Sequence, residues 1–163
     1  MAERTEGLAV ELARAFIEHA ACEEEEQFLT HLQIHKLLYY AQGWRLAIDG
    51  APFFAEGIEA WSHGPVVPAV WKHFDGTEHG FPTNTPDAPS ELDDARREFA
   101  SRVWATYRDF SPNKLREMTK SEPPWLDARG DTPACDRCSA PISVDALRDY
   151  FESIHDESSS TTP

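Results

Sequence analysis

The chain has 163 residues, of which 29 are acidic and 15 are basic, so its formal net charge is −14. A chain of this length buries enough surface to fold around one core without a disulfide or metal staple. The negative charge excludes general, sequence-independent binding to nucleic acid, because such binding depends on cations that displace counterions from phosphates. Most of this charge lies in residues 1–26 and 131–163.

Cysteine usage and the absence of long apolar runs indicate the cellular setting. Three cysteines fit a reduced thiol set better than a secreted disulfide framework. No apolar run approaches the roughly 18 residues of a membrane span, and residues 1–7 lack a signal-peptide pattern. We therefore expect a cytoplasmic protein without a membrane segment.

The first third of the sequence predicts two helices. Apolar residues at helical spacing predict the first from about Glu6 to Ala21. The second spans residues 31–49, because Thr30 and Gln33 form a capping-box pattern and Gly50 supplies the stop. Apolar side chains, Ile48 among them, form two stripes on opposite sides of this helix. It should pack on both faces and organise the core.

The next segment predicts little regular structure. Residues 53–61 are apolar and aromatic and predict at most a small β pair. Gly64-Pro65 predicts a turn that leads into a short helix, with Pro65 or Pro68 in its first turn. Residues 75–90, rich in Gly and Pro, predict a surface loop.

The C-terminal half predicts three more helices. Ser90 is expected to cap a long helix that ends near Phe110, and Ser111 begins a short one. Pro123-Pro124 predicts a break in the chain. Ser143 then caps the last helix, with Val144 expected to point inward.

These elements predict a mainly α fold, a compact single domain of about six helices around the central helix at about 31–49. At most a small β pair is expected near 53–61. The domain spans residues 1–156. Residues 157–163 have nothing to bury and predict a disordered polar tail.

Two short motifs suggest metal chemistry. His31 and His35 lie one helical turn apart, as in half of a zinc-protease helix, but Leu32 replaces the essential Glu. The alternative is a solvated pair on a polar strip that also holds Gln42. Cys135 and Cys138 form one CxxC pair, which fits half of a zinc site, a redox pair or two incidental thiols. We expect no cofactor, with these two cysteines as the metal candidates.

Nothing in the sequence favours an enzyme. No glycine-rich phosphate loop and no GxSxG motif occurs, and Asp93 and Asp94 point to different faces of their predicted helix. Arg97 and Arg108 share a solvent side of that helix. They favour i, i+4 ion pairs, with a small nucleic-acid contact as the minor alternative.

Aromatic residues gather in two runs, residues 37–44 and 60–71. Core packing accounts for most of them. Trp61 and Trp125 lie beside Gly-Pro and Pro-Pro turns, however, and Trp is a common interface anchor. A recognition groove is therefore the alternative.

These same runs carry a family resemblance. The segments Lys36 to Trp44 and Glu59 to Pro68, followed by Pro124-Trp125, are similar to the signature of the Panacea antitoxin domain. That family includes many proteins catalogued as phage-associated. The resemblance extends over about residues 9–153. The sequence departs from the pattern at Lys120, where His is frequent, and in the inserted loop around Cys135.

The resemblance implies a mainly helical domain that neutralises a cognate protein toxin by direct binding, the toxin being encoded next door. The expected partner-binding residues are Tyr40, Trp44, Trp61, His63, Gly64, Pro65, Val66 and Trp125. Each of these residues has packing alone as its alternative role. Other readings are an adaptor that delivers a bound partner to a cytosolic protease, with residues 157–163 as its handle, or a phage-associated regulatory binding protein.

Overall fold

The computed structural model describes residues 7–23, 29–74 and 86–160. Within these ranges the chain forms seven helices and three short strands, so the predicted mainly α fold is confirmed. In chain order the elements are α1 (Leu8–Ala21), α2 (His31–Asp49), β1 (Ile58–Trp61), β2 (Gly64–Val66), α3 (Pro68–His73), α4 (Asp94–Tyr107), α5 (Pro112–Lys120), α6 (Pro123–Arg129), β3 (Pro141–Ile142) and α7 (Val144–Ser160).

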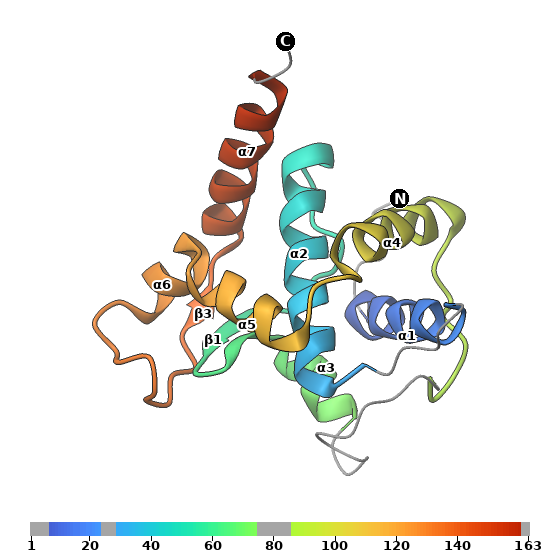
Figure 1. Cartoon of the computed structure of the whole chain (residues 1–163), viewed down its shortest axis with the longest axis horizontal. Helices are drawn as coiled ribbons and strands as arrows, with labels where there is room; N and C mark the ends of the chain where they lie inside the picture. Colours follow the sequence, from blue (N-terminus) through green and yellow to red (C-terminus); the bar gives the residue numbers. More distant parts are fainter. Residues whose placement is uncertain (1–6, 24–28, 75–85, 161–163) are drawn as a thin grey trace.

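Helix α2 lies at the centre of the molecule, as predicted. Figure 1 shows α1 and α4 on one side of it and α6 and α7 on the other, and it also contacts α5 and β2. The capping box is present: the Gln33 amide donates to the Thr30 hydroxyl at 3.1 Å. Gly50 ends the helix in the left-handed conformation. Local signals fixed both ends of α2, and packing on opposite faces buries most of its length.

The three strands form one small antiparallel sheet with β1 in the middle. Ala60 pairs with Pro65 across the β1–β2 hairpin, and Ile58 pairs with Ile142 on the other edge. Pro65 therefore lies in a strand, and Pro68 is the proline in the first turn of the following helix. The sheet has one strand more than predicted, because β3 is only two residues long and carries no sequence signal.

One predicted helix start and one predicted chain break are wrong. Asp93, not Ser90, caps α4, since its carboxylate accepts from the Arg96 amide at 2.8 Å. The Ser90 hydroxyl instead donates to the Glu11 carbonyl at 2.7 Å and ties the preceding segment to α1. Pro123-Pro124 begins α6 rather than breaking the chain, because a first helical turn needs no amide donors.

Two predicted core side chains are exposed. Ile48 is 54% exposed and Val144 is 44% exposed. Both lie near helix ends, where none of the described elements covers them.

Helix α7 is longer than predicted. It reaches Ser160, so residues 157–160 are helical instead of disordered, and residues 161–163 lie outside the described ranges. Adding residues to an existing helix costs little, so a helix can continue into a polar segment. Most of the loop predicted at 75–90 also lies outside the described ranges. No described helix is long and apolar enough to cross a membrane.

Candidate partner-binding site

The eight predicted partner-binding residues lie in two separate places. Tyr40 and Trp44 lie on α2, against α4 and α7. The other six belong to the β1–β2 hairpin and α6: Trp61, His63, Gly64, Pro65, Val66 and Trp125. The structure therefore does not bring them together into one face.

The first place is an aromatic cluster. Tyr40 is buried and stacks on Tyr107, with ring centroids 4.2 Å apart. The Trp44 indole donates a hydrogen bond to the Tyr107 hydroxyl at 2.7 Å and meets Phe151 edge-on at 5.1 Å. Trp44 is only half-buried. It is therefore rigidly held and still accessible, as an interface anchor must be.

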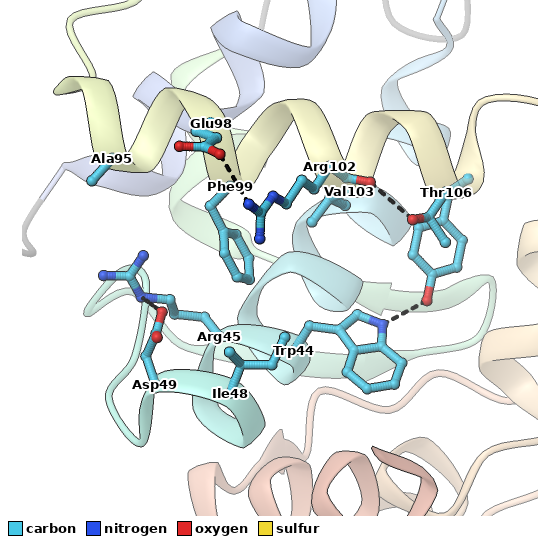
Figure 2. Close-up of a pocket in the computed structure, with 11 residues that line it drawn as sticks. Trp44, Arg45, Ile48, Asp49, Ala95, Glu98, Phe99, Arg102, Val103 and Thr106 are labelled. Carbon is cyan, nitrogen blue, oxygen red and sulfur yellow. Dashed lines mark hydrogen bonds and ion pairs between the residues drawn. The ribbon is translucent and has the colours of Figure 1, made fainter. Parts of the chain in front are cut away.

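Trp44 opens onto a groove, here called the α2–α4 groove, with a volume of about 550 Å³ (Figure 2). Figure 2 shows Phe99 of α4 and Ile48 of α2 facing the space between the two helices. The lining residues are Trp44, Arg45, Ile48, Asp49, Ala95, Glu98, Phe99, Arg102, Val103, Thr106 and Tyr107.

The rims of the groove are charged and internally paired. Arg45 pairs with Asp49 at 3.0 Å, and Arg102 pairs with Glu98 at 2.9 Å. The Arg45 guanidinium also lies 5.5 Å from the centre of the Phe99 ring. An apolar floor between polar rims is the usual anatomy of a protein interface, and its length along two helices suits an amphipathic helix.

The sequence identified Trp44 but missed the rest of this groove. Helical spacing places Ile48 and Phe99 on the apolar stripes of their helices. Periodicity shows that a side chain is apolar. It does not show that two helices diverge and leave its stripe uncovered.

The second place consists largely of packed residues. Trp125 is buried, its indole donates to the Trp61 carbonyl at 2.8 Å, and the Arg129 guanidinium lies 4.8 Å from its ring centre. Val66 is fully buried. Trp61 is half-buried, and its indole donates to the Glu59 carboxylate at 2.9 Å. Packing therefore accounts for Trp125 and Val66, whereas Trp61 keeps some exposed surface.

The Gly64-Pro65 pair is required by backbone geometry. Gly64 has a φ of +113°, and a Cβ there would lie 2.7 Å from Lys36 Cε. The Pro65 carbonyl accepts a long hydrogen bond of 3.5 Å from Lys36 Nζ. Only glycine combines that conformation with such a close approach. The neighbouring His63 is exposed and is the hairpin residue most open to a partner.

The predicted polar strip on α2 is wrong, because His31, His35 and Gln42 are buried. The His35 Nδ1 accepts from the Val67 amide at 3.0 Å, and burial lowers its pKa well below the ordinary value, so the ring is neutral. Gln42 bonds to the backbone of Phe53 and Phe54. Gln42 thus satisfies backbone groups of the segment before β1, and His35 satisfies the amide of the residue that follows β2.

A half-buried carboxylate that the sequence did not reveal joins α2 to α6. Glu122 accepts hydrogen bonds from the hydroxyls of Tyr39 and Tyr40, both at 2.9 Å. Burial raises the pKa of Glu122, and burial and this carboxylate raise the pKa of both tyrosines. The acid precedes α6 directly, so it holds that helix against the core.

Arg129 holds the loop that carries Cys135 and Cys138. Arg129 donates to the carbonyls of Ala60, Pro133 and Asp136, at 2.9, 2.5 and 2.7 Å. Cys135 is exposed and Cys138 is partly exposed, and both are free thiols. Among the described residues, no group of three His, Cys, Asp or Glu is placed to hold a metal ion.

The arginines suggested for nucleic acid take part in ion pairs. Arg108 pairs with Glu23 at 3.1 Å, and Arg97 lies 4.0 Å from Glu18 while it donates to the Leu92 carbonyl. The i, i+4 pairs expected for these two arginines are therefore wrong: Arg97 of α4 meets Glu18 of α1, and Arg108, which follows α4, meets Glu23, which follows α1.

Comparison with known families adds the decisive observation. Residues 34–126, more than half of the chain, match the model described as "Antitoxin SocA-like, Panacea domain". The chain belongs to the Panacea antitoxin family. The match begins in α2 and ends in α6, so this Panacea segment contains both walls of the α2–α4 groove and the β1–β2 hairpin. No curated protein and no solved structure matches the chain.

Proposed function

We propose that this Panacea protein is an antitoxin that neutralises a protein toxin by binding it directly, with the α2–α4 groove as the principal contact. The observation that carries the proposal is the position of the groove. Both of its walls lie inside the segment that matches the antitoxin family. A binding protein needs an uncovered apolar surface there, and a domain that served only as a scaffold would not.

The chemistry of the groove supports a helical or extended apolar segment of the toxin as its occupant. Trp44 supplies a large rigid ring that is already fixed by Tyr107, so little side-chain entropy is lost on binding. Ile48 and Phe99 supply aliphatic and aromatic surface beside it. The two ion pairs on the rims can re-form with polar groups of a partner at the edge of the contact.

The predicted site residues then fall into different roles. Trp44 contacts the toxin, and Trp61 and His63 offer a smaller second contact on the hairpin. Tyr40 positions Trp44 through Tyr107. Four residues hold the hairpin and α6 in place: Gly64, Pro65, Val66 and Trp125. The acidic chain would speed its encounter with a basic toxin, because complementary fields raise association rates.

The proposal is tested by co-expression. The product of the open reading frame beside this gene is induced alone, with this chain, and with an empty vector. We expect arrested growth with the neighbour alone and normal growth when both are made. A harmless neighbour, or arrest that this chain does not relieve, would contradict the proposal.

The same strains separate neutralisation from delivery to a protease. The half-life of the neighbour is followed after synthesis is blocked, with the intact chain and with residues 157–163 removed. Simple neutralisation predicts rescue without faster decay in either case. Decay that accelerates with the intact chain and slows with the truncated one would favour the adaptor.

A further inference from the structure

A second cavity lies on another side of α2 and shares no lining residue with the α2–α4 groove. Its volume is about 370 Å³, within the range of sites for small ligands. It lies between the first turns of α2 and α5, the tip of the hairpin and α3. The lining residues are Thr30, His31, Leu32, Gln33, Lys36, His63, Trp71, Pro112, Asn113 and Arg116.

The walls of this cavity, here called the Lys36 cavity, are cationic. The chain has 29 acidic residues, yet none of the described residues that line this cavity is Asp or Glu. Neither Lys36 nor Arg116 forms an ion pair with a carboxylate of the described residues. The excess positive charge at this site is therefore not neutralised within the described part of the chain.

Lys36 is the least expected of these charges. It is 2% exposed, and its ammonium donates a long hydrogen bond of 3.5 Å to the Pro65 carbonyl. A buried ammonium without a carboxylate partner is costly, and a hydrophobic residue of similar length would avoid that cost. An anion brought in by a ligand would supply the missing partner.

The N-terminal ends of two helices add to the positive potential of the cavity. The first turns of α2 and of the nine-residue α5 both line the cavity. Amide groups and the helix dipole favour an anion at such an end. Two helix starts, a buried lysine and an arginine thus converge on one space.

We propose that the Lys36 cavity binds the oxyanion group, phosphate or carboxylate, of a small ligand, with Lys36 and Arg116 as its charged partners. Trp71, stacked on His31 with ring centroids 4.4 Å apart, forms a flat wall for the apolar part of that ligand. This site is separate from the α2–α4 groove, although His63 belongs both to this cavity and to the smaller hairpin contact.

Two anions serve as probes, sulfate for a tetrahedral phosphate-like group and acetate for a carboxylate. Each is titrated into the full chain at constant ionic strength, with chloride as the balancing anion, and amide resonances of Leu32 and Asn113 are followed by NMR. Saturable shifts with sulfate, acetate or both support the proposal, and the tighter anion identifies the group. Shifts no larger than those with chloride would overturn it.

Matched variants on α5 test the residues. Arg116→Gln removes the exposed charge that lines the cavity, and Lys114→Gln removes one that does not. We expect the dissociation constant of the preferred anion to rise about tenfold in Arg116→Gln, as for one lost charge-assisted hydrogen bond, and to be unchanged in Lys114→Gln. Equal effects of the two variants would mean nonspecific screening and would refute the site.

Lys36 gives a second, independent readout. Burial and the nearby Arg116 and Lys120 of α5 lower its pKa to about 7, and His31, His35 and His63 are the other titratable groups around it. A bound anion raises that pKa, so sulfate affinity should fall as pH rises through about 7. Lys36→Met should abolish this dependence without loss of thermal stability. An unchanged pH profile in Lys36→Met would contradict the assignment.

Discussion

Gly43 offers the sharpest test of how the family motif builds the fold. It lies in the middle of α2, where alanine is ordinarily about 1 kcal/mol more favourable than glycine. A Cβ at this position would lie 2.2, 2.3 and 2.6 Å from three ring atoms of Phe151 on α7. These distances are far below the roughly 3.5–4.0 Å of ordinary carbon contact. Overpacking of this kind costs about 1–3 kcal/mol. Because the ring is fully buried, we expect a value near the upper end.

The net prediction is that Gly43→Ala lowers the free energy of unfolding by about 1–2 kcal/mol, against the helix propensity scale. Urea denaturation followed by circular dichroism measures this, and the melting temperature should fall by about 2–8 °C. Gly57→Ala is the control, since Gly57 is exposed and its Cβ would meet nothing within 4 Å.

A double variant isolates the cause. If the Phe151 ring is the obstacle, Gly43→Ala combined with Phe151→Leu should lose less stability than the sum of the two single changes. Additive losses, or a Gly43→Ala variant as stable as the parent, would refute the close approach of α2 and α7.

Two further predictions concern buried polar groups. Gln42→Ala should lower the free energy of unfolding by about 2–4 kcal/mol in urea denaturation, because backbone groups of Phe53 and Phe54 lose their partner inside the core. Glu122→Gln should change the pH dependence of stability. Burial raises the pKa of Glu122 above the ordinary 4.5, so the folded state favours the protonated acid. The stability of the parent relative to the variant should therefore fall as pH rises from about 4.5 through the raised pKa.

Each of these two variants has a control variant at an exposed residue. Asn113→Ala, on the surface of α5, should change stability by less than about 0.5 kcal/mol, and an equal loss would contradict the role of Gln42. Glu117→Gln, which removes an exposed acid of α5, is the matched control for the charge change. A Glu122→Gln profile that runs parallel to that of the parent would show that the acid is not held in a buried site.

The sequence predicted structure well where the determinants are local. The capping box at Thr30, the stop at Gly50 and the caps at Ser111 and Ser143 are present, because each depends on residues within one turn. Ser90 was mistaken for a cap because its real partner, the Glu11 carbonyl, lies 79 residues away in the chain.

Local sequence patterns did not predict which polar side chains are buried or what shape the site has. His35 and Gln42 looked solvated because their partners, Val67 and the Phe53 segment, come from a different element. In the same way, Trp44 was identified from its residue type, while Ile48 was assigned to the core. Whether an apolar stripe of α2 is covered depends on how α4 lies against α2. No short sequence pattern predicts that arrangement.

The measurement that tests the central claim most directly is the affinity of the purified chain for the neighbouring gene product, with and without a charge in the α2–α4 groove. Ile48 and Leu126 are both large exposed apolar residues, 54% and 45% exposed, but only Ile48 lines the groove. We expect Ile48→Arg to raise the dissociation constant by about tenfold or more, as for a disrupted interface hot spot, without a change in melting temperature. Leu126→Arg should bind as the parent does. Unchanged binding in Ile48→Arg, or an equal loss in both variants, would contradict binding through this groove.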